Sequence, residues 1–333
     1  MEEFLWLAFK KINGVGPRKI LDVYTKNPQL TYEAILEDNN LPHPIRLDDM
    51  QKFVDYVKEA KDELVHSREN GIEVITYDNP RYPMLLKLIP DPPIVIYCKG
   101  NLKALDIERK IAVIGTRDAT PKGLQVAEKI AYEFAKRGFV IVSGLAFGID
   151  TAGHKGALDA NGHTIAVMPC GLDQIYPKKN KYLADLIIEK EGLLLSEYPI
   201  GVPPQKQFFV QRDRIQSGLS LGIFPIQTDV KGGTMHTVGF AEKQKRLIVC
   251  PKPVESVQLP QYLGIQKLLD ENRATVLESV ESYDMIETKL LENMTINFPD
   301  LREQWPELAS ASDQASNFVI STTTPIEQPE LFD

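Results

Sequence analysis

Cysteine is scarce in this sequence of 333 residues, and long apolar runs are missing. The three cysteines, Cys98, Cys170 and Cys250, lie far apart and form no CxxC pair, which argues against a disulfide framework or a zinc site. No stretch approaches the roughly 20 apolar residues of a membrane-spanning helix. The N-terminal segment carries acids where a secretion signal carries bases. We therefore expect a protein of the reducing cytoplasm with no membrane partner.

The motifs of several common enzyme classes are also missing. The chain has no GxGxxG dinucleotide fingerprint and no GxxxxGK[ST] phosphate loop. Its five histidines show no HExxH spacing, and no GxSxG nucleophile elbow occurs. From the sequence we therefore assign no catalytic residue, no metal ligand and no cofactor.

The net charge of −8 argues at first against a polyanionic ligand. The excess of acid is local, however, because residues 1–70 hold 10 Lys and Arg against 13 Asp and Glu, and residues 291–333 hold one against eight. The intervening residues 71–290 hold 27 against 25, so the central part of the chain is nearly neutral. Binding to a nucleic acid is therefore compatible with the composition.

The hydrophobic pattern divides the chain into three regions. Residues 1–70 show helical periodicity and predict a small helical domain. In residues 72–290, two short β-branched runs precede six apolar strands that alternate with helices, which predicts an α/β fold with a doubly wound parallel sheet. Residues 291–333 are acidic and poor in aliphatic side chains, and we expect a flexible tail there. The six expected strands are 110–115, 139–144, 163–171, 193–199, 220–226 and 246–251.

Glycine-rich loops follow three of these strands, at residues 115–117, 143–150 and 231–234. In open parallel sheets, ligands bind outside the carboxyl ends of the strands, where backbone amides approach an anion. Arg117 adds a fork for a phosphate, and Thr234 adds a hydroxyl donor. The alternative is that the glycines only permit tight turns. The expected phosphate contacts are Gly115, Arg117, Ser143, Gly144, Lys231, Gly232, Gly233 and Thr234.

A further cluster of aromatic and basic residues lies between the last expected strands. Phe208 and Phe209 precede Arg212 and Arg214, and aromatic side chains beside arginines suit a nucleic-acid backbone with stacked bases. The alternative is that the two phenylalanines belong to the core and that Arg212 pairs with Asp213 or another acid. The spacing alone leaves both interpretations open.

The N-terminal region contains a possible second phosphate site. Gly14 and Gly16 separate two expected helices, which is the form of a helix-hairpin-helix turn. In such a turn the amides at the start of the second helix bind a phosphate, and here Arg18 and Lys19 add positive charge. A tight helical hairpin without a ligand is the alternative.

Six ordered segments within residues 72–252 resemble the DNA-processing protein A family, called DprA or Smf. They are YPMLLKLIPDPPIVIYCKGN, IAVIGTR, SGLAFGIDTAGHKGAL, TIAVMPCGLDQIYPKKN, LLSEYP and FVQRDRIQSGLS. The resemblance implies a Rossmann-like doubly wound sheet behind a small helix-hairpin-helix (SAM-like) domain. It also implies a cytoplasmic homodimer that binds single-stranded DNA, protects it and loads a RecA-type recombinase onto it. Members of the family are not known as enzymes.

The resemblance places Arg117, Ser143, Gly144, Arg212 and Arg214 in the DNA-binding pocket, with residues 232–234 at a neighbouring turn. This sequence departs from the family pattern in both of its basic motifs, since SGLARGID becomes SGLAFGID and FPRRNR becomes FVQRDR. The changed residues are Phe147, Gln211 and Asp213.

The loss of positive charge is expected to weaken binding to phosphates. Phe147 could offset part of that loss by stacking on a base.

A nucleotide-binding or nucleotide-cleaving protein is the alternative function. The Gly232-Gly233-Thr234 turn resembles the PGGxGT loop of the phosphoribohydrolase-like (LOG) Rossmann proteins. Those enzymes place a glutamate soon after the loop, and here His236 and Thr237 occupy that place. The single-stranded-DNA hypothesis is therefore preferred.

The sequence ends on two large apolar residues after an acidic stretch. Gln328, Leu331 and Phe332 resemble the short peptide by which bacterial replication and repair proteins bind the sliding clamp. In that peptide the Leu-Phe pair fills an apolar pocket, and we expect an affinity on the order of micromolar because the segment must become ordered on binding. Packing of both side chains onto the body of the protein is the alternative.

Overall fold

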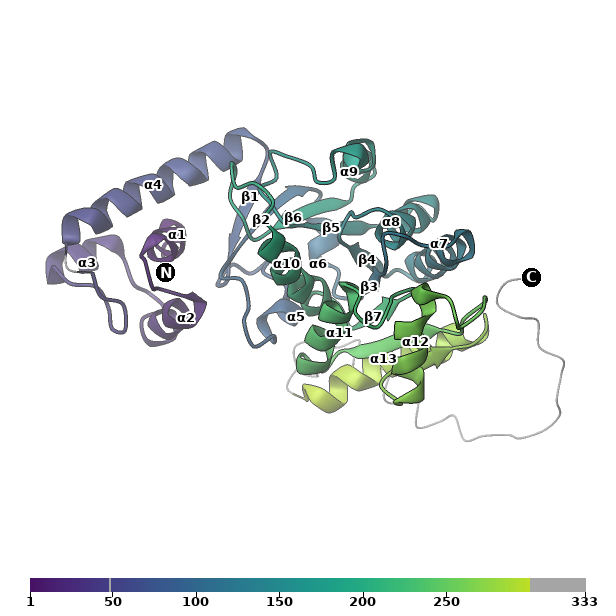
Figure 1. Ribbon diagram of the computed structural model, residues 1–333. Helices are drawn as coiled ribbons and strands as arrows, with labels where there is room; N and C mark the ends of the chain where they lie inside the picture. The colour runs from purple at the N-terminus through teal and green to yellow at the C-terminus, as the bar shows by residue number, and fades with distance from the viewer. Residues whose placement is uncertain (48, 300–333) are drawn as a thin grey trace. The chain divides into compact units, whose positions relative to one another are not determined.

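The computed structural model describes residues 1–47 and 49–299 (Figure 1). The chain divides into two compact units. Unit 1 consists of Met1–Glu108 and Val167–Ile215, and the described part of unit 2 consists of residues 109–166 and 216–299. The expected helical domain therefore shares a unit with part of the region that follows it. The possible clamp-binding residues Gln328, Leu331 and Phe332 lie outside the described residues.

Unit 1 begins with helices, as the periodicity predicts. Trp6 and Phe9 on the first helix are fully buried, and the Phe9 ring stacks on Phe53 of the fourth helix with centroids 5.6 Å apart. Thr31 caps the third helix, where its side chain accepts a hydrogen bond from the Ala34 amide. The four helices are α1 (Glu3–Lys11), α2 (Pro17–Lys26), α3 (Tyr32–Asp38) and α4 (Met50–Glu69).

The strands of unit 1 pair in antiparallel fashion. The two β-branched runs expected within residues 72–100 form β1 (Glu73–Thr76) and β2 (Val95–Gly100), which pair with each other. β2 also pairs antiparallel with β6 (Leu193–Ser196), the expected strand 193–199. The remaining elements that begin in unit 1 are α5 (Met84–Lys87), α6 (Lys103–Asp106), η1 (Lys178–Asn180), α9 (Lys181–Glu189) and α10 (Lys206–Gly218).

Unit 2 contains a parallel sheet in the order β5-β4-β3-β7-β8-β9. All of these strands except the last, at residues 275–277, are fully or mostly buried because helices cover both faces, which explains their continuous apolar sequences. The strands are β3 (Lys110–Ile114), β4 (Val140–Ser143), β5 (Thr164–Met168, with its last residues in unit 1), β7 (Gly222–Pro225), β8 (Leu247–Pro251) and β9 (Thr275–Leu277). The doubly wound parallel sheet expected from the sequence is confirmed here.

Two helices of unit 2, at residues 121–136 and 282–297, share an aromatic cluster with the sheet. The Phe134 ring contacts the rings of Phe139, Phe224 and Tyr283 edge to face, with centroids 4.9 to 5.5 Å apart. Such pairs contribute about 1 kcal/mol each beyond the apolar area that they bury. The helices are α7 (Pro121–Lys136), α8 (Ile149–Asp159), α11 (Thr234–Lys243), α12 (Pro260–Asp270) and α13 (Ser282–Asn297).

The flexible tail expected for residues 291–333 is wrong for residues 291–297, and residues 300–333 lie outside the described part of the chain. Helix α13 continues to Asn297, and its Leu291 and Met294 side chains are buried. These apolar residues give the last turns a packing face that the acidic average composition of residues 291–333 concealed. No helix among residues 1–47 and 49–299 is both long and apolar enough to cross a membrane.

Close contact between α7 and α8 requires a glycine at position 156. A Cβ atom on Gly156 would lie 2.2 Å from the Glu128 carbonyl oxygen and 3.0 Å from the Ala131 Cβ atom. The backbone oxygen cannot move away without shifting α7, so the two helices approach each other at a distance that only glycine permits.

We expect Gly156→Ala to lower the free energy of unfolding by about 2 kcal/mol, because the added methyl group overpacks the helix contact. Gly239 of α11 is the matched control, since a Cβ atom there would have no neighbour within 4 Å. Gly239→Ala should raise stability by about 0.5 kcal/mol through helix propensity alone. Urea denaturation measures both changes, and equal effects of the two substitutions would contradict the packing argument.

Candidate nucleic-acid interface

The sheet of unit 2 has a topological switch point between β3 and β7. From β3 the chain proceeds outward to β4 and β5, and it later returns to the other side of β3 as β7. Ligands of doubly wound sheets bind at this point, outside the carboxyl ends of the strands. Arg117 follows β3 by three residues and its side chain is exposed. The Thr116 amide beside it donates to the Gln227 carbonyl oxygen, 2.8 Å away, and so joins the segments that follow β3 and β7.

The loops 115–117 and 143–150 pack directly against each other. Gly148 has φ +75°, and a Cβ atom there would lie 2.4 Å from the Thr116 carbonyl oxygen. The Ile149 amide donates to the same oxygen at 3.2 Å. A Cβ atom on Gly115 would lie 2.5 Å from the Ile149 side chain. Both glycines are therefore required for the close approach of the two loops.

The polar groups of loop 143–150 are used differently from the prediction. We expected the Gly144 amide and the Ser143 hydroxyl to contact a phosphate. Instead, the Asp150 carboxylate accepts hydrogen bonds from the amides of Gly144 (3.1 Å) and Ala146 (3.3 Å). The Ser143 hydroxyl is fully buried and donates to the Val113 carbonyl oxygen at 2.7 Å. These groups stabilise the loop from within, because a carboxylate of the chain already satisfies the amides.

Phe147 is the exposed residue at the tip of this loop. Its side chain is 40% exposed, whereas Leu145 two residues earlier is fully buried with φ +61°. Single exposed apolar side chains are common at protein surfaces, so its exposure shows accessibility and not by itself a function. Phe147 is therefore available for contact with a ligand near Arg117.

The third loop follows β7, the neighbour of β3. Lys231 and Gly233 are exposed, and Gly233 precedes the first residue of α11, Thr234. The Gly232 amide donates to the Asp229 carbonyl oxygen at 2.9 Å, and a Cβ atom on Gly232 would lie 2.5 Å from Thr228 Oγ1. The tight-turn interpretation thus accounts for Gly232, while Lys231 adds an exposed positive charge.

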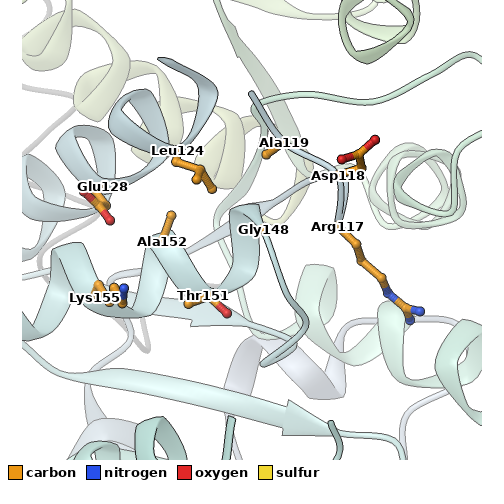
Figure 2. Close-up of a pocket in the computed structure, with 9 residues that line it drawn as sticks. All are labelled: Arg117, Asp118, Ala119, Leu124, Glu128, Gly148, Thr151, Ala152 and Lys155. Carbon is orange, nitrogen blue, oxygen red and sulfur yellow. The ribbon is translucent and has the colours of Figure 1, made fainter. Parts of the chain in front are cut away.

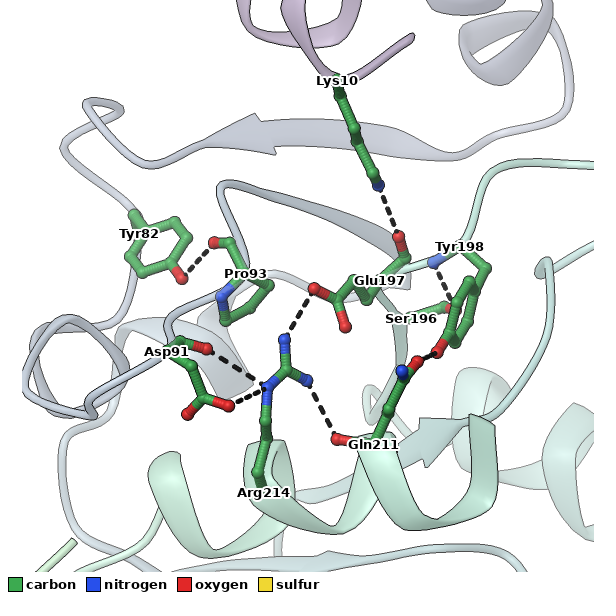
Figure 3. Close-up of polar contacts among 9 residues, drawn as sticks. All are labelled: Lys10, Tyr82, Asp91, Pro93, Ser196, Glu197, Tyr198, Gln211 and Arg214. Carbon is green, nitrogen blue, oxygen red and sulfur yellow. Dashed lines mark hydrogen bonds and ion pairs between the residues drawn. The ribbon is translucent and has the colours of Figure 1, made fainter. Parts of the chain in front are cut away.

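Arg214, in unit 1, forms the centre of a buried ionic network rather than an open phosphate site (Figure 3). Its guanidinium donates to Glu197 Oε1 at 2.7 Å and to the Gln211 carbonyl oxygen at 2.9 Å, and it pairs with Asp91 at 3.2 Å. Burial disfavours the charged form, but Glu197 and Asp91 outweigh this effect and raise the pKa of Arg214 above its ordinary value. The sequence-based assignment of Arg214 to the DNA pocket missed these acids because both are distant in the chain.

Arg212 is held in a similar way. Only 6% of it is exposed, its Nη1 donates to the Val167 carbonyl oxygen at 2.8 Å, and its Nε lies 3.1 Å from Asp213 Oδ1. Of the two interpretations that the sequence left open, the ion pair between Arg212 and Asp213 is the one that the structure contains. Both arginines of the FVQRDR segment therefore stabilise unit 1.

Aromatic side chains of α10 lie in pairs at the surface of unit 1. Phe208 stacks on Tyr198 with centroids 4.1 Å apart, and Phe209 contacts Tyr176 edge to face at 5.2 Å. Phe208 and Phe209 are half-buried, and Tyr176 is 39% exposed. Gln211 accepts a hydrogen bond from the Tyr198 hydroxyl at 2.6 Å. The phenylalanines are thus neither fully in the core nor free, and the ring of Phe209 keeps some accessible surface.

The same network connects α10 with the first helix of the chain. The Lys10 ammonium donates to the carbonyl oxygen of Glu197 at 3.0 Å, while the Glu197 side chain holds Arg214 (Figure 3). Glu197 therefore contacts α1 through its backbone and α10 through its carboxylate.

The turn between α1 and α2 has the form expected of a helix-hairpin-helix turn. Gly14 has φ +76°, and Gly16 is the N-cap of α2 ahead of Pro17. Arg18 and Lys19 are exposed at the start of α2, and the Lys19 ammonium donates to the Gly14 carbonyl oxygen at 3.0 Å. The geometry places positive charge at a helix N-terminus, and binding of a phosphate there stays a prediction.

No set of metal ligands is assembled in the part of the chain that the structure describes. Within residues 1–47 and 49–299, no group of three or more His, Cys, Asp or Glu side chains is arranged to hold a metal ion. The cysteines Cys98, Cys170 and Cys250 are buried and unbridged, and burial raises the pKa of the Cys170 thiol to about 11.

The switch point and its loops define this chain as a doubly wound α/β protein of the Rossmann-like class, with a positively charged group at the usual ligand edge. A sequence model described as DNA recombination-mediator protein A matches residues 73–288. The chain belongs to this family.

Curated relatives agree with that assignment. Protein Smf of Synechocystis is 36% identical over 259 residues, which cover 74% of this chain and 63% of the relative. The DNA processing protein DprA of Bacillus subtilis is 44% identical over 179 residues, covering 54% of this chain and 60% of the relative. The chain thus spans somewhat less than two thirds of the length of these relatives.

Solved structures of the family share the fold. DNA processing protein A from Streptococcus pneumoniae aligns with a TM-score of 0.69 at 30% identity, covering 83% of this chain and 95% of that one. The protein from Helicobacter pylori aligns with a TM-score of 0.58 at 32% identity over 66% of this chain and 96% of that one. The structure of the latter is described as showing a single-stranded DNA binding mode.

We expect Glu197→Gln to lower the free energy of unfolding by about 3 kcal/mol, because it leaves the buried guanidinium of Arg214 without its main counter-charge. The control is Glu242→Gln, which breaks the 2.8 Å pair with Arg273. That pair is partly exposed and Arg273 keeps a second partner in Glu271, so its loss should cost about 0.5 kcal/mol. Urea denaturation of both variants distinguishes them, and a small effect of Glu197→Gln would contradict the structural role of Arg214.

Proposed function

We propose that this protein binds single-stranded DNA, protects it and hands it to a recombinase. The observation that carries the proposal is the position of Arg117, exposed at the switch point where loops 115–117 and 143–150 pack together. Family membership supports it, because the family is described as recombination mediators. The Helicobacter pylori relative, described by its single-stranded DNA binding mode, supports the choice of nucleic acid.

The chemistry proposed for unit 2 is recognition of the DNA backbone. The Arg117 guanidinium forms two parallel hydrogen bonds to a phosphate, and Lys231 adds a second positive charge after β7. Each neutralised phosphate releases counterions, so binding should weaken as the salt concentration rises. Phe147, exposed at the tip of loop 143–150, stacks on a base in this proposal.

Unit 1 contributes separately in the same proposal. The helix-hairpin-helix turn with Gly14, Gly16, Arg18 and Lys19 binds a second phosphate, and Phe209 offers a partly exposed ring to a base. Arg212 and Arg214 are left out of the proposed contacts, because carbonyl oxygens and carboxylates already surround them.

The proposed partners follow from the family resemblance. They are a RecA-type recombinase, which receives the strand, and a second copy of this chain in a homodimer. A sliding clamp stays a proposed partner through Gln328, Leu331 and Phe332. We propose a binding protein of the cytoplasm rather than an enzyme. The nucleotide-cleaving alternative rested on the turn at Gly232, which close packing on Thr228 explains without a ligand.

Arg117→Ala should weaken binding to oligo-dT about tenfold and reduce the slope of log affinity against log salt by about one. The control is Lys243→Ala, which removes an exposed charge at the C-terminal end of α11, away from the edge where that helix begins. It should leave both values unchanged. Fluorescence anisotropy over a salt series measures them, and a folded Arg117→Ala variant that binds like the wild type would contradict the site.

Phe147→Arg should tighten oligo-dT binding at low salt, because it adds a charge beside the bound backbone. At high salt, where charge is screened, the lost stacking should weaken binding by about 1 kcal/mol or more. The same salt series measures both limits. Since the side chain is exposed, unchanged affinity at both limits would show that the tip of loop 143–150 does not meet the DNA.

A further inference from the structure

A pocket of about 220 Å³ lies between α7 and α8, next to the loop that carries Arg117 (Figure 2). The two helices touch where Gly156 meets the Glu128 carbonyl oxygen, and the pocket occupies the space toward their N-terminal ends. Its volume is below the range of about 300 to 1,000 Å³ that is typical of sites for drug-sized ligands. It therefore suits a flat fragment such as one nucleobase and is too small for a dinucleotide.

The walls of the pocket combine apolar surface with two opposite charges. Leu124 of α7 and Ala152 of α8 supply apolar contact, while Glu128 and Lys155 come from the same two helices. Within the described residues, neither Glu128 nor Lys155 belongs to an ion pair closer than 4.0 Å. A carboxylate and an ammonium thus line one small pocket without neutralising each other.

A ligand that bridges these two charges must offer hydrogen-bond donors to the carboxylate and an acceptor to the ammonium. Guanine presents two neighbouring donors, N1–H and the N2 amino group, beside the acceptor O6. The carboxylate of Glu128 accepts both donors, and Lys155 donates to O6. Adenine, cytosine and thymine each offer only one donor group on that edge, so they satisfy one carboxylate oxygen instead of two.

We propose that this pocket receives one guanine base, and that it does so from the strand bound at Arg117. This inference rests on the proposed binding of single-stranded DNA. Arg117 lines the pocket, and Figure 2 shows its side chain extending away from Leu124 and Ala152. The pocket lies beside the loop that carries Arg117, and in this proposal one unstacked base of the strand held there enters it. The protein then prefers strands that offer a guanine at this position, although it binds the rest of the strand through phosphates.

The test compares oligo-dT with the same oligonucleotide carrying one central guanine, at constant salt, by fluorescence anisotropy. Wild type should bind the guanine-containing strand about tenfold more tightly, as a bidentate base contact requires. A central inosine, which lacks the N2 amino group, should lose most of that gain. Equal binding of strands with guanine, inosine, adenine or cytosine at the central position would overturn the proposal.

Two substitutions connect the preference to the pocket. Glu128→Gln should remove the guanine preference and leave oligo-dT affinity unchanged, and Asp159→Asn, an exposed acid at the end of α8, should preserve both. A preference that survives Glu128→Gln would overturn the assignment. Loss of all oligonucleotide binding by the wild type would instead contradict the proposed function itself.

The same base could come from a free mononucleotide. A parallel titration therefore uses deoxyguanosine monophosphate alone. Binding of that nucleotide, abolished by Glu128→Gln, together with no discrimination among strands would show a mononucleotide site and overturn the claim that the pocket reads DNA.

Discussion

The Asp150 carboxylate accepts hydrogen bonds from the amides of Gly144 and Ala146, and these bonds hold the loop against which the segment of Arg117 packs. It holds loop 143–150 in one conformation, so that Gly148 can rest on the Thr116 carbonyl oxygen. The loop after β3 is thereby held from two sides, by loop 143–150 and by the hydrogen bond from the Thr116 amide to the Gln227 carbonyl oxygen, and Arg117 extends from this loop. The Asp150 carboxylate thus organises the loops at which the protein is proposed to bind a DNA phosphate.

The strand and helix pattern of unit 2 could be predicted because its strands are buried on both faces and read as continuous apolar runs. The convergence of Gly115 and Gly148 followed from the rule that parallel strands place their carboxyl ends at one edge. The division of the chain into units could not be predicted, since it depends on which distant segments pack together. Residues 291–297 were wrongly assigned to the tail for a related reason. Their apolar residues Leu291 and Met294 were averaged with the acids of residues 291–333.

The assignment of individual site residues was less successful than the fold, and the two arginines of α10 explain why. The sequence predicts Arg214 as a phosphate ligand, but in the structure Glu197 and Asp91 lie within 3.2 Å of it. Spacing along one helix contains no information about acids that other segments bring to it. Gly144 is a different case, because the carboxylate that accepts its amide hydrogen bond lies only six residues away in the sequence. An acid at the start of the helix after a glycine loop is the local signal that could have indicated this.

Glu197 also connects the N-terminal helices of unit 1 with α10. Its carbonyl oxygen accepts a hydrogen bond from the Lys10 ammonium of α1, and its carboxylate accepts one from the Arg214 guanidinium of α10. One residue therefore connects segments from opposite ends of unit 1. Loosening either helix disturbs the hydrogen bonds of the other. We therefore expect the N-terminal helices and the segment after β6 that carries Glu197 to open together, as one cooperative foldon.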